Sequence, residues 1–320
     1  MKAVVYTKYG PPDVLKIKEI EKPSPKENQV LIKVHASSIN AQEYRKMRAT
    51  PILLRLMIGG VVKPKDPRLG SDVAGGVEAV GENITKFQPG DEVFGFGYGT
   101  FAEYVCSKET SVTIKPANIS FSEAAAVPIA AITALQGLRH AGGIQPGQKV
   151  LIQGASGGVG TFAVQLAKSF GAEVTAVCST RNLDMVRSIG ADRVIDYTRE
   201  DFTKKRECYD LIFAVNGYHS LSAYKRVLNP HGIYVCAGGT LPQFFQAMLL
   251  GSLMSEKGGK KMSSMGIAKV NQEDLTHLGE LLKDGKIAPV IDRNYPLDEI
   301  VQAMRYVEDK HAQGKVVITV

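Results

Sequence analysis

The sequence has no tryptophan, only four cysteines and no long apolar run. Cys106, Cys178, Cys208 and Cys236 form no CxxC pair, which argues against a zinc knuckle and against a disulfide framework. Cys178 and Cys236 lie in apolar stretches, where we expect buried thiols. This cysteine usage fits a reducing cytoplasm.

The sequence also lacks the patterns of membrane insertion and secretion. Apolar stretches such as FFQAMLLGSLM (244–254) are too short to span a bilayer. The amino-terminal MKAVVYTKYG lacks the apolar core of a signal peptide. We therefore expect a cytoplasmic protein that has no membrane partner.

The net charge of +7 is mildly basic. The densest basic run, EKGGKK (256–261), contains no aromatic residue, so it indicates a solvated loop and not a nucleic-acid surface. We expect no nucleic-acid partner. Part of the positive excess can serve an anionic cofactor.

The pattern of apolar residues changes near residue 121. Before it, alternating stretches such as VLIKVHA (30–36) and turn residues such as QPGDE (88–92) predict an all-β, barrel-like segment. After it, strands and helices alternate, which predicts a parallel, doubly wound sheet and an α/β fold. Near the carboxyl end we expect helices over 271–285 and 297–309 and a final strand, KVVITV.

The segment GASGGVG (154–160) follows a predicted strand and opens a helix. Its spacing is a variant of the dinucleotide-binding fingerprint, in which a helix amino terminus holds the pyrophosphate through free N–H groups and its dipole. Gly157 would let the backbone approach the pyrophosphate, and Gly160 would let the helix pack closely. An ordinary tight turn is the alternative. The predicted cofactor-binding residues of this turn are Ala155, Ser156, Gly157, Gly158, Val159 and Gly160.

The acidic residue that usually binds the NAD ribose is absent after the second predicted strand, EVTAVCS (173–179). Cys178, Ser179, Arg181 and Asn182 stand there instead. Hydroxyl, guanidinium and amide groups suit a 2′-phosphate, so we predict that the cofactor is NADPH. The alternative for Arg181 is a solvated surface arginine.

The chain resembles the medium-chain dehydrogenase/reductase superfamily, and most closely its zinc-free quinone oxidoreductase (zeta-crystallin-like) branch. This resemblance implies a GroES-like β-barrel catalytic domain at 1–121 and 271–320. A Rossmann domain with a doubly wound parallel sheet would occupy 122–270. It also implies a homodimer that pairs through an edge strand near 262–269. The resemblance rests on LGSDVAGGVEAVGENITKFQPGDEVFGFG (69–97), FAEYV (101–105), AAITALQGL (130–138), VLIQGASGGVG (150–160) and HAQGKVVITV (311–320).

Zinc-dependent members of this superfamily carry a cysteine and a Gly-His-Glu motif where this chain has Asn40 and Gly70, Ser71 and Asp72. Zinc prefers thiolate and imidazole ligands, and the six histidines show no ligand spacing, so we expect no metal. Without a Lewis acid nothing stabilises an alkoxide, which disfavours alcohol oxidation. A quinone or an α,β-unsaturated carbonyl accepts hydride more easily, because the charge delocalises to oxygen.

The resemblance also implies residues that contact the cofactor. Thr133 should approach the nicotinamide, unless its hydroxyl bonds its own helix backbone. Tyr197 should flank the adenosine, unless it is a core or strand tyrosine. Asn216, Gly238 and Gly239 should line the ribose and nicotinamide, unless they form plain turns.

Asn40 and Tyr44 are the candidate catalytic residues on the substrate side, where the zinc-type relatives build their metal site. Tyr44 would donate to a substrate carbonyl, or it packs beneath the apolar loop 48–68. Asn40 would act in the site, or it caps local backbone. Lys315 would face the cofactor or the solvent.

The sequence therefore predicts a cytoplasmic, NADPH-dependent, zinc-independent reductase of quinones or α,β-unsaturated carbonyls. An enoyl-thioester or 2-alkenal reductase is one alternative, with the same hydride chemistry. The other is a protein that binds NADPH without turnover, as a sensor or structural protein.

Overall fold

The computed structural model describes residues 1–49, 55, 60–239, 246–247, 251, 253–309 and 312–320. The chain divides into two units, Met1–Ile129 with Val270–Val320, and Ala130–Lys269. Most of the apolar part of loop 48–68 lies outside the described residues. Within them, no helix combines the length and the apolar character needed to cross a membrane.

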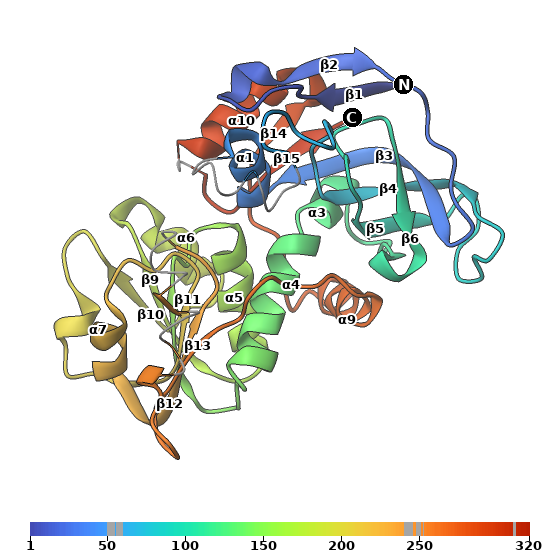
Figure 1. The fold of residues 1–320 in the computed structure, drawn as a ribbon. Coiled ribbons are helices and arrows are strands. Elements are labelled where there is room, and N and C mark those ends of the chain that lie inside the picture. Colours follow the sequence, from blue (N-terminus) through green and yellow to red (C-terminus); the bar gives the residue numbers. More distant parts are fainter. Residues whose placement is uncertain (50–54, 56–59, 240–245, 248–250, 252, 310–311) are drawn as a thin grey trace. The chain divides into compact units, whose positions relative to one another are not determined.

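The first unit is built on mainly antiparallel strands contributed by both ends of the chain, with one parallel pair, β14 and β15 (Figure 1). A seven-stranded sheet runs in the order β14-β15-β3-β4-β5-β7, with β6 on β3, and β1 pairs with β2. The last strand, β15, pairs antiparallel with β3, with Val316 opposite Ile39. The strands of this unit are β1 (Lys2–Val5), β2 (Lys16–Glu19), β3 (Gln29–Ile39), β4 (Asp72–Val80), β5 (Glu92–Phe96), β6 (Tyr104–Lys108), β7 (Val112–Ile114), β14 (Ile291–Pro296) and β15 (Lys315–Thr319).

Helices cover parts of this sheet. Helix α9 begins after Asn271, whose side chain accepts a hydrogen bond from the N–H of Asp274, a stabilising N-cap. The helices expected over 271–285 and 297–309 are confirmed as α9 and α10. The helices of this unit are α1 (Ala41–Arg48), α3 (Phe121–Ala125), α9 (Gln272–Lys283) and α10 (Ile300–Glu308), with short 3₁₀ turns at Pro12–Val14, Glu109–Ser111 and Leu297–Glu299.

The boundary between the units lies within helix α4 (Pro128–Gln136) and not at 121–122. Helix α3 packs on strands β3, β4 and β15 of the first unit. Phe121 at its start stacks on His35 of β3, with ring centroids 4.3 Å apart. The change of pattern near residue 121 thus marks the first of two helices, and only the second leads into the other unit.

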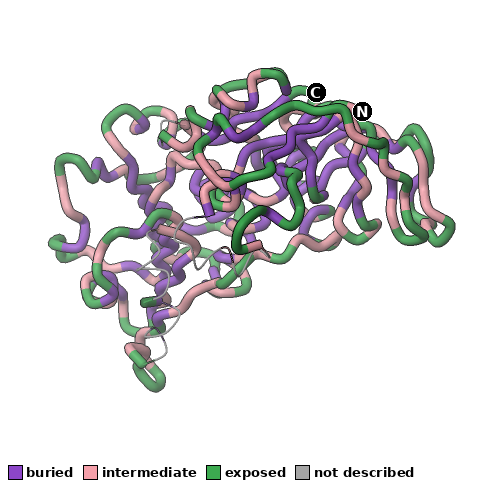
Figure 2. Tube along the Cα trace, turned by 45° about the horizontal axis from the view of Figure 1, so that its top comes forward, coloured by how far each residue is buried: buried purple, intermediate pink, exposed green. Residues whose placement is uncertain are grey.

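The core of the first unit follows from alternation along its strands. In β3, Val30, Ile32 and Val34 are buried, whereas Lys33 and His35 are exposed. Figure 2 shows the strands as largely buried segments joined by exposed turns. Burial of this apolar face is the main stabilising contribution to the unit.

The second unit is a six-stranded parallel sheet in the order β10-β9-β8-β11-β12-β13. The order reverses at the β8–β11 junction, and in such sheets ligands bind at the carboxyl ends of the strands beside this junction. The predicted α/β, doubly wound sheet is confirmed. Its strands are β8 (Lys149–Gln153), β9 (Glu173–Cys178), β10 (Arg193–Asp196), β11 (Tyr209–Ala214), β12 (Leu228–Cys236) and β13 (Lys261–Ser264), and its helices are α5 (Gly158–Ser169), α6 (Leu183–Ser188) and α7 (Leu221–Arg226), with the turns Gly137–Ala141, Thr180–Asn182 and Phe202–Lys204.

Two details of this unit test the sequence analysis. Cys178 and Cys236 are buried, as expected for thiols in apolar strands. The edge strand β13 ends at Ser264, so the segment 262–269 is only partly a strand.

Candidate functional site

The turn between β8 and α5 has the backbone geometry of a phosphate-binding turn. Gly154 has a φ of +83°, a conformation that glycine adopts without strain. A Cβ on Gly160 would lie 2.0 Å from the Gly154 carbonyl oxygen and 2.7 Å from the Ala155 Cα, so the helix packs on the turn as closely as only glycine allows. A Cβ on Gly157 would meet nothing closer than 3.7 Å, which leaves space in front of the helix amino terminus.

The carboxyl ends of neighbouring strands bring further predicted cofactor residues to this turn. Asn216, just after β11, lies against Gly154, and its N–H donates to the carbonyl of Gln153 at 3.3 Å. Gly238 passes so close to the backbone that a Cβ there would lie 2.5 Å from the carbonyl oxygen of Val215. At Gly154 and Gly238 the neighbouring chain lies so close that a side chain would not fit without a shift, which an ordinary turn does not require.

Asn182 links the phosphate turn to the end of β9. Its side-chain amide donates to the hydroxyl of Ser156 at 2.9 Å and to that of Ser179 at 3.0 Å. The residue is 4% exposed, and its Oδ1 is buried without a hydrogen-bond partner in the described structure. Arg181 is exposed on the same short turn.

Cys178 cannot offer its side chain to a cofactor. The thiol is buried at 1% exposure, and burial, reinforced by the nearby charge of Asp196, raises its pKa to about 11. The enclosed thiol argues against a side-chain contact with the cofactor, and a contact through the Cys178 backbone stays a prediction.

Asp196 is an acidic residue at this end of the sheet that the sequence analysis missed. It ends β10 opposite Cys178 and accepts hydrogen bonds from the hydroxyls of Thr180 at 2.5 Å and Thr198 at 2.7 Å. The hydrogen bond from Thr180 is the main reason why the pKa of Asp196 is lowered. The Arg199 guanidinium lies 3.5 Å away and offsets the negative charge. Asp196 lies at the end of β10 and not of β9, where the ribose-binding acid is expected, and it directly precedes Tyr197.

Tyr197 is not a core residue. It is 49% exposed, and its ring packs edge-on against that of Tyr218, with centroids 6.0 Å apart. This rules out the core alternative and leaves an accessible aromatic surface near the strand ends. Thr133, half-buried in α4, stays a predicted nicotinamide contact.

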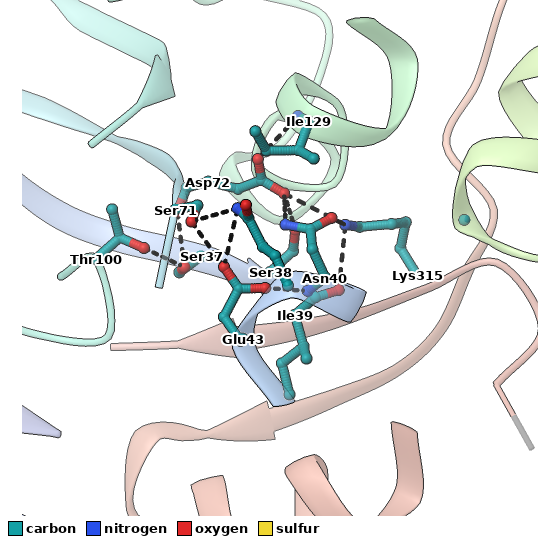
Figure 3. A network of polar contacts seen from close by, with 12 residues as sticks. Ser37, Ser38, Ile39, Asn40, Glu43, Ser71, Asp72, Thr100, Ile129 and Lys315 are labelled. Atoms are coloured by element: carbon teal, nitrogen blue, oxygen red, sulfur yellow. Dashed lines mark hydrogen bonds and ion pairs between the residues drawn. The ribbon is translucent and has the colours of Figure 1, made fainter. Parts of the chain in front are cut away.

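In the first unit, Asp72 is the centre of a buried polar network (Figure 3). This first residue of β4 is fully buried. Its carboxylate accepts from the Ser38 hydroxyl at 2.6 Å, the Asn40 amide at 2.8 Å, the Ile129 N–H at 2.9 Å and the Lys315 ammonium at 3.3 Å. With donors on both oxygens the carboxylate is well satisfied, as a buried charge must be.

Lys315 is a buried member of this network. It is 2% exposed, and its ammonium donates to the Asn40 side-chain oxygen at 2.6 Å as well as to Asp72. The interpretation of Lys315 as a solvated lysine is therefore wrong. Because β15 pairs with β3, with Val316 opposite Ile39, the Lys315 ammonium lies beside Asn40, the residue after Ile39.

Glu43 forms a second part of the network. Its carboxylate accepts from the N–H of Asn40 at 2.7 Å and from the hydroxyl of Ser71 at 2.7 Å. Burial raises the pKa of Glu43, and the hydrogen bond from Ser71 opposes this shift. Glu43 and Gly70 also line a cavity of about 440 Å³ in this unit.

Comparison with known proteins assigns the family. Residues 26–117 match the family described as alcohol dehydrogenase GroES-like domain, and residues 189–318 match the family described as zinc-binding dehydrogenase. A 2-methylene-furan-3-one reductase of Solanum lycopersicum is 37% identical over 99% of this chain and 79% of its own length. The chain belongs to the medium-chain dehydrogenase/reductase superfamily.

Two further similarities place it more closely within the superfamily. An NADPH-dependent alkenal/one oxidoreductase of Arabidopsis thaliana, described as chloroplastic, is 33% identical over 99% of this chain and 79% of its own length. The structure of a quinone oxidoreductase from Coxiella burnetii superposes with a TM-score of 0.86 at 31% identity, covering 100% of this chain and 99% of that one. The chain is an enzyme of the quinone oxidoreductase type.

The donor set of this medium-chain reductase does not fit the metal that one family description names. At the positions of the zinc ligands stand Asn40, Ser71 and Asp72, and the Lys315 ammonium already bonds two of them. A second cation there would be repelled and would lack soft ligands. In the part of the chain that is described, no three His, Cys, Asp or Glu side chains group as a metal site.

Tyr44 points to a different environment from its neighbour Glu43. Its ring packs against the apolar cluster of the first unit that includes Met47 and Ile300. Packing was one of the two alternatives for Tyr44. The expected contact was with the loop 48–68, whereas the observed contact is with this cluster. Its role as a donor to the substrate stays a prediction.

Proposed function

We propose that this medium-chain reductase transfers hydride from NADPH to a quinone or an α,β-unsaturated carbonyl without a metal ion. The observation that carries the proposal is the buried ammonium of Lys315 among the side chains that replace the zinc ligands. A nicotinamide dinucleotide supplies the hydride when it is bound. The names of the relatives, quinone oxidoreductase and alkenal/one oxidoreductase, support this acceptor class.

The second unit offers what a dinucleotide needs. The open space before Gly157 and the amino terminus of α5 suit a pyrophosphate, which the free N–H groups and the helix dipole would bind. Asn182 donates to Ser156 and Ser179, and its side-chain oxygen has no hydrogen-bond partner among the described residues. Thr133 would contact the nicotinamide.

The first unit offers what an activated acceptor needs. The Asn40 amide and the Tyr44 hydroxyl are the donors that we assign to the acceptor oxygen. Hydrogen bonds from such donors suffice when charge delocalises over a quinone or an enone, and a saturated alcohol would need a Lewis acid. The cavity beside Glu43 has the size of small-molecule sites, which are typically about 300–1,000 Å³, but among the described residues neither Asn40 nor Tyr44 lines it, so it does not itself support these two donors.

The preference for NADPH depends on a balance of charges at the end of β9. Arg181 and Arg199 favour a 2′-phosphate, and the negative charge of Asp196 opposes it. One charge-assisted hydrogen bond is worth about 1.5–3 kcal/mol, or roughly 10–150-fold in affinity. Arg181→Glu should therefore weaken NADPH binding by about this factor and leave NADH binding nearly unchanged.

Titration of both cofactors by fluorescence tests this preference. Arg193→Glu is the matched control, because it makes the same charge change at the opposite, amino-terminal end of β10. Equal affinity of the unsubstituted protein for NADPH and NADH would refute the preference. An equal loss of NADPH affinity in both variants would show that Arg181 contributes only to the overall charge and does not bind the 2′-phosphate.

An acceptor screen at fixed NADPH tests the reaction. Quinones and enones should be reduced faster than 2-alkenals and enoyl thioesters; the reverse order would favour the alternative, a reductase of enoyl thioesters or 2-alkenals. Tight NADPH binding without oxidation by any acceptor would favour a non-catalytic sensor or structural protein.

We further propose a cytoplasmic homodimer without nucleic-acid or membrane partners. The open edge strand β13 is a surface at which a second copy could pair, and pairing would protect its unpaired backbone groups. Light scattering that gives the mass of one chain at micromolar concentration would contradict the dimer.

A further inference from the structure

The side-chain amide of Asn40 is held at both ends by charged groups (Figure 3). Its oxygen accepts from the Lys315 ammonium at 2.6 Å, and its nitrogen donates to Asp72 at 2.8 Å. An ammonium can only donate and a carboxylate can only accept, so this arrangement fixes which end of the amide is oxygen. Asn40 therefore has one orientation in the network.

The amide nitrogen carries a second hydrogen. Among the described residues the nitrogen donates to Asp72 alone, which leaves this second hydrogen without an acceptor there. Asn40 is half-buried, whereas Asp72 and Lys315 are enclosed at 0% and 2% exposure. Of Asn40, Asp72 and Lys315, Asn40 is thus the residue whose donor can reach a bound molecule.

The contact from Lys315 also changes the strength of that donor. A hydrogen bond from a charged group is stronger than one from a neutral group, and hydrogen bonds in a chain polarise one another. The ammonium withdraws electron density through the amide oxygen, which makes the N–H a better donor. In a buried environment this effect is not screened by water.

We propose that Lys315 is a positioning residue for the reduction, which orients and polarises the Asn40 amide so that its second hydrogen binds the acceptor oxygen. This inference rests on the proposed function. When hydride adds to the β-carbon of an enone, the C=C electron pair shifts and the carbonyl oxygen becomes an enolate. The Asn40 N–H stabilises that charge, a solvent proton then completes the saturated ketone, and the nicotinamide is left oxidised.

A structural role is the competing explanation, because an unpaired buried carboxylate is strongly destabilising. Three substitutions separate the two roles. Lys315→Arg keeps the charge and the donors, Lys315→Gln keeps a neutral donor, and Lys315→Met keeps neither. Lys33→Met, at an exposed lysine of the adjoining strand β3, is the control for loss of one positive charge.

The test measures kcat/KM for an enone and a quinone, the Kd of NADPH and the thermal unfolding midpoint of each variant. We expect enone kcat/KM to fall in the order Arg, Gln, Met, reaching about 10–100-fold for Met, part of the effect of losing a whole oxyanion donor. The fall with quinones should be under about 10-fold, because their product anion is already delocalised. NADPH affinity and the Lys33→Met control should stay unchanged.

A double-mutant cycle with Asn40→Ala gives the decisive result. If Lys315 acts through Asn40, Lys315→Gln should cause no further loss of enone turnover once the amide is gone. An undiminished loss in the Asn40→Ala background, or an equal loss with both acceptors, would overturn the inference. A weaker NADPH affinity would overturn it by making Lys315 a cofactor contact. If Lys315→Met fails to fold, Lys315→Gln and Lys315→Arg still give the order. Failure of the unsubstituted protein to reduce any acceptor would instead refute the proposed function.

Discussion

Gly160 and Gly157 stand three residues apart in one turn, and the structure assigns them different tasks. At Gly160 an added methyl group would meet the backbone of Gly154 and Ala155, at 2.0 Å from an oxygen and 2.7 Å from a carbon. No flexible side chain can move away, so the turn itself must shift. At Gly157 the same methyl group would enter open space, 3.7 Å from the nearest atom.

The magnitudes follow from these contacts. Overpacking costs about 1–3 kcal/mol, and a clash with backbone belongs at the upper end of this range. Alanine inside a helix regains about 1 kcal/mol relative to glycine. Gly160→Ala should therefore lose about 2 kcal/mol of unfolding free energy, or about 4–8 °C in the unfolding midpoint. Gly157→Ala should lose under about 1 kcal/mol, the difference between glycine and alanine at an N-cap.

The affinity for NADPH should also distinguish Gly157→Ala from Gly160→Ala. Gly157→Ala places a methyl group where we expect the pyrophosphate, so the Kd of NADPH should rise at least about 10-fold, equivalent to about 1.4 kcal/mol, with nearly native stability. Gly160→Ala should impair both. Differential scanning fluorimetry and fluorescence titration measure the two quantities. A Gly157→Ala protein that binds NADPH normally would refute the assignment of this turn.

Two predictions concern α1. Tyr44→Phe keeps the ring packing, so the stability should be unchanged. The value of kcat/KM should fall by up to about 100–1,000-fold for enones and by under about 10-fold for quinones. Unchanged values for both acceptors would show that Tyr44 has a packing role alone. Burial raises the pKa of Glu43, so at pH values between its unfolded and folded pKa the folded state binds more protons than the unfolded chain. Stability should therefore fall, relative to Glu43→Gln, as pH rises from about 4.3 through the raised pKa, and denaturant titrations of both proteins with the same pH slope would contradict this.

Local patterns made much of the fold predictable. The alternation in β3 and the apolar face of α5 each depend on neighbouring residues, so both elements follow from the sequence. The phosphate turn is equally local, and the clash at Gly160 agrees with the spacing argument. The unit to which α3 belongs depends on what Phe121 packs against, and a helical pattern does not contain this information.

The candidate site was less predictable, because its contacts join distant segments. Asp72 and Lys315 are 243 positions apart, and a single sequence does not indicate that these two charges pair. Asp196 lies at the end of β10, and only the pairing of β10 with β9 places it beside Cys178, so the sequence of β9 alone does not reveal it. Burial of Glu43 was likewise invisible, because a charged residue in a helix is usually solvated.

The arrangement around Asp72 also explains how a buried polar network is stable in a chain without the zinc-type ligands. Burying a carboxylate is costly unless donors satisfy both oxygens and an opposite charge lies nearby. Here Ser38, Asn40 and the Ile129 N–H supply neutral donors, and Lys315 supplies the charge. Loss of Lys315 alone would leave the buried carboxylate of Asp72 without an opposite charge, and loss of Asp72 alone would leave the buried ammonium without one. Either change would destabilise the fold. The two charges therefore stabilise the buried site only when both are present, and together they fix the Asn40 amide in a single orientation.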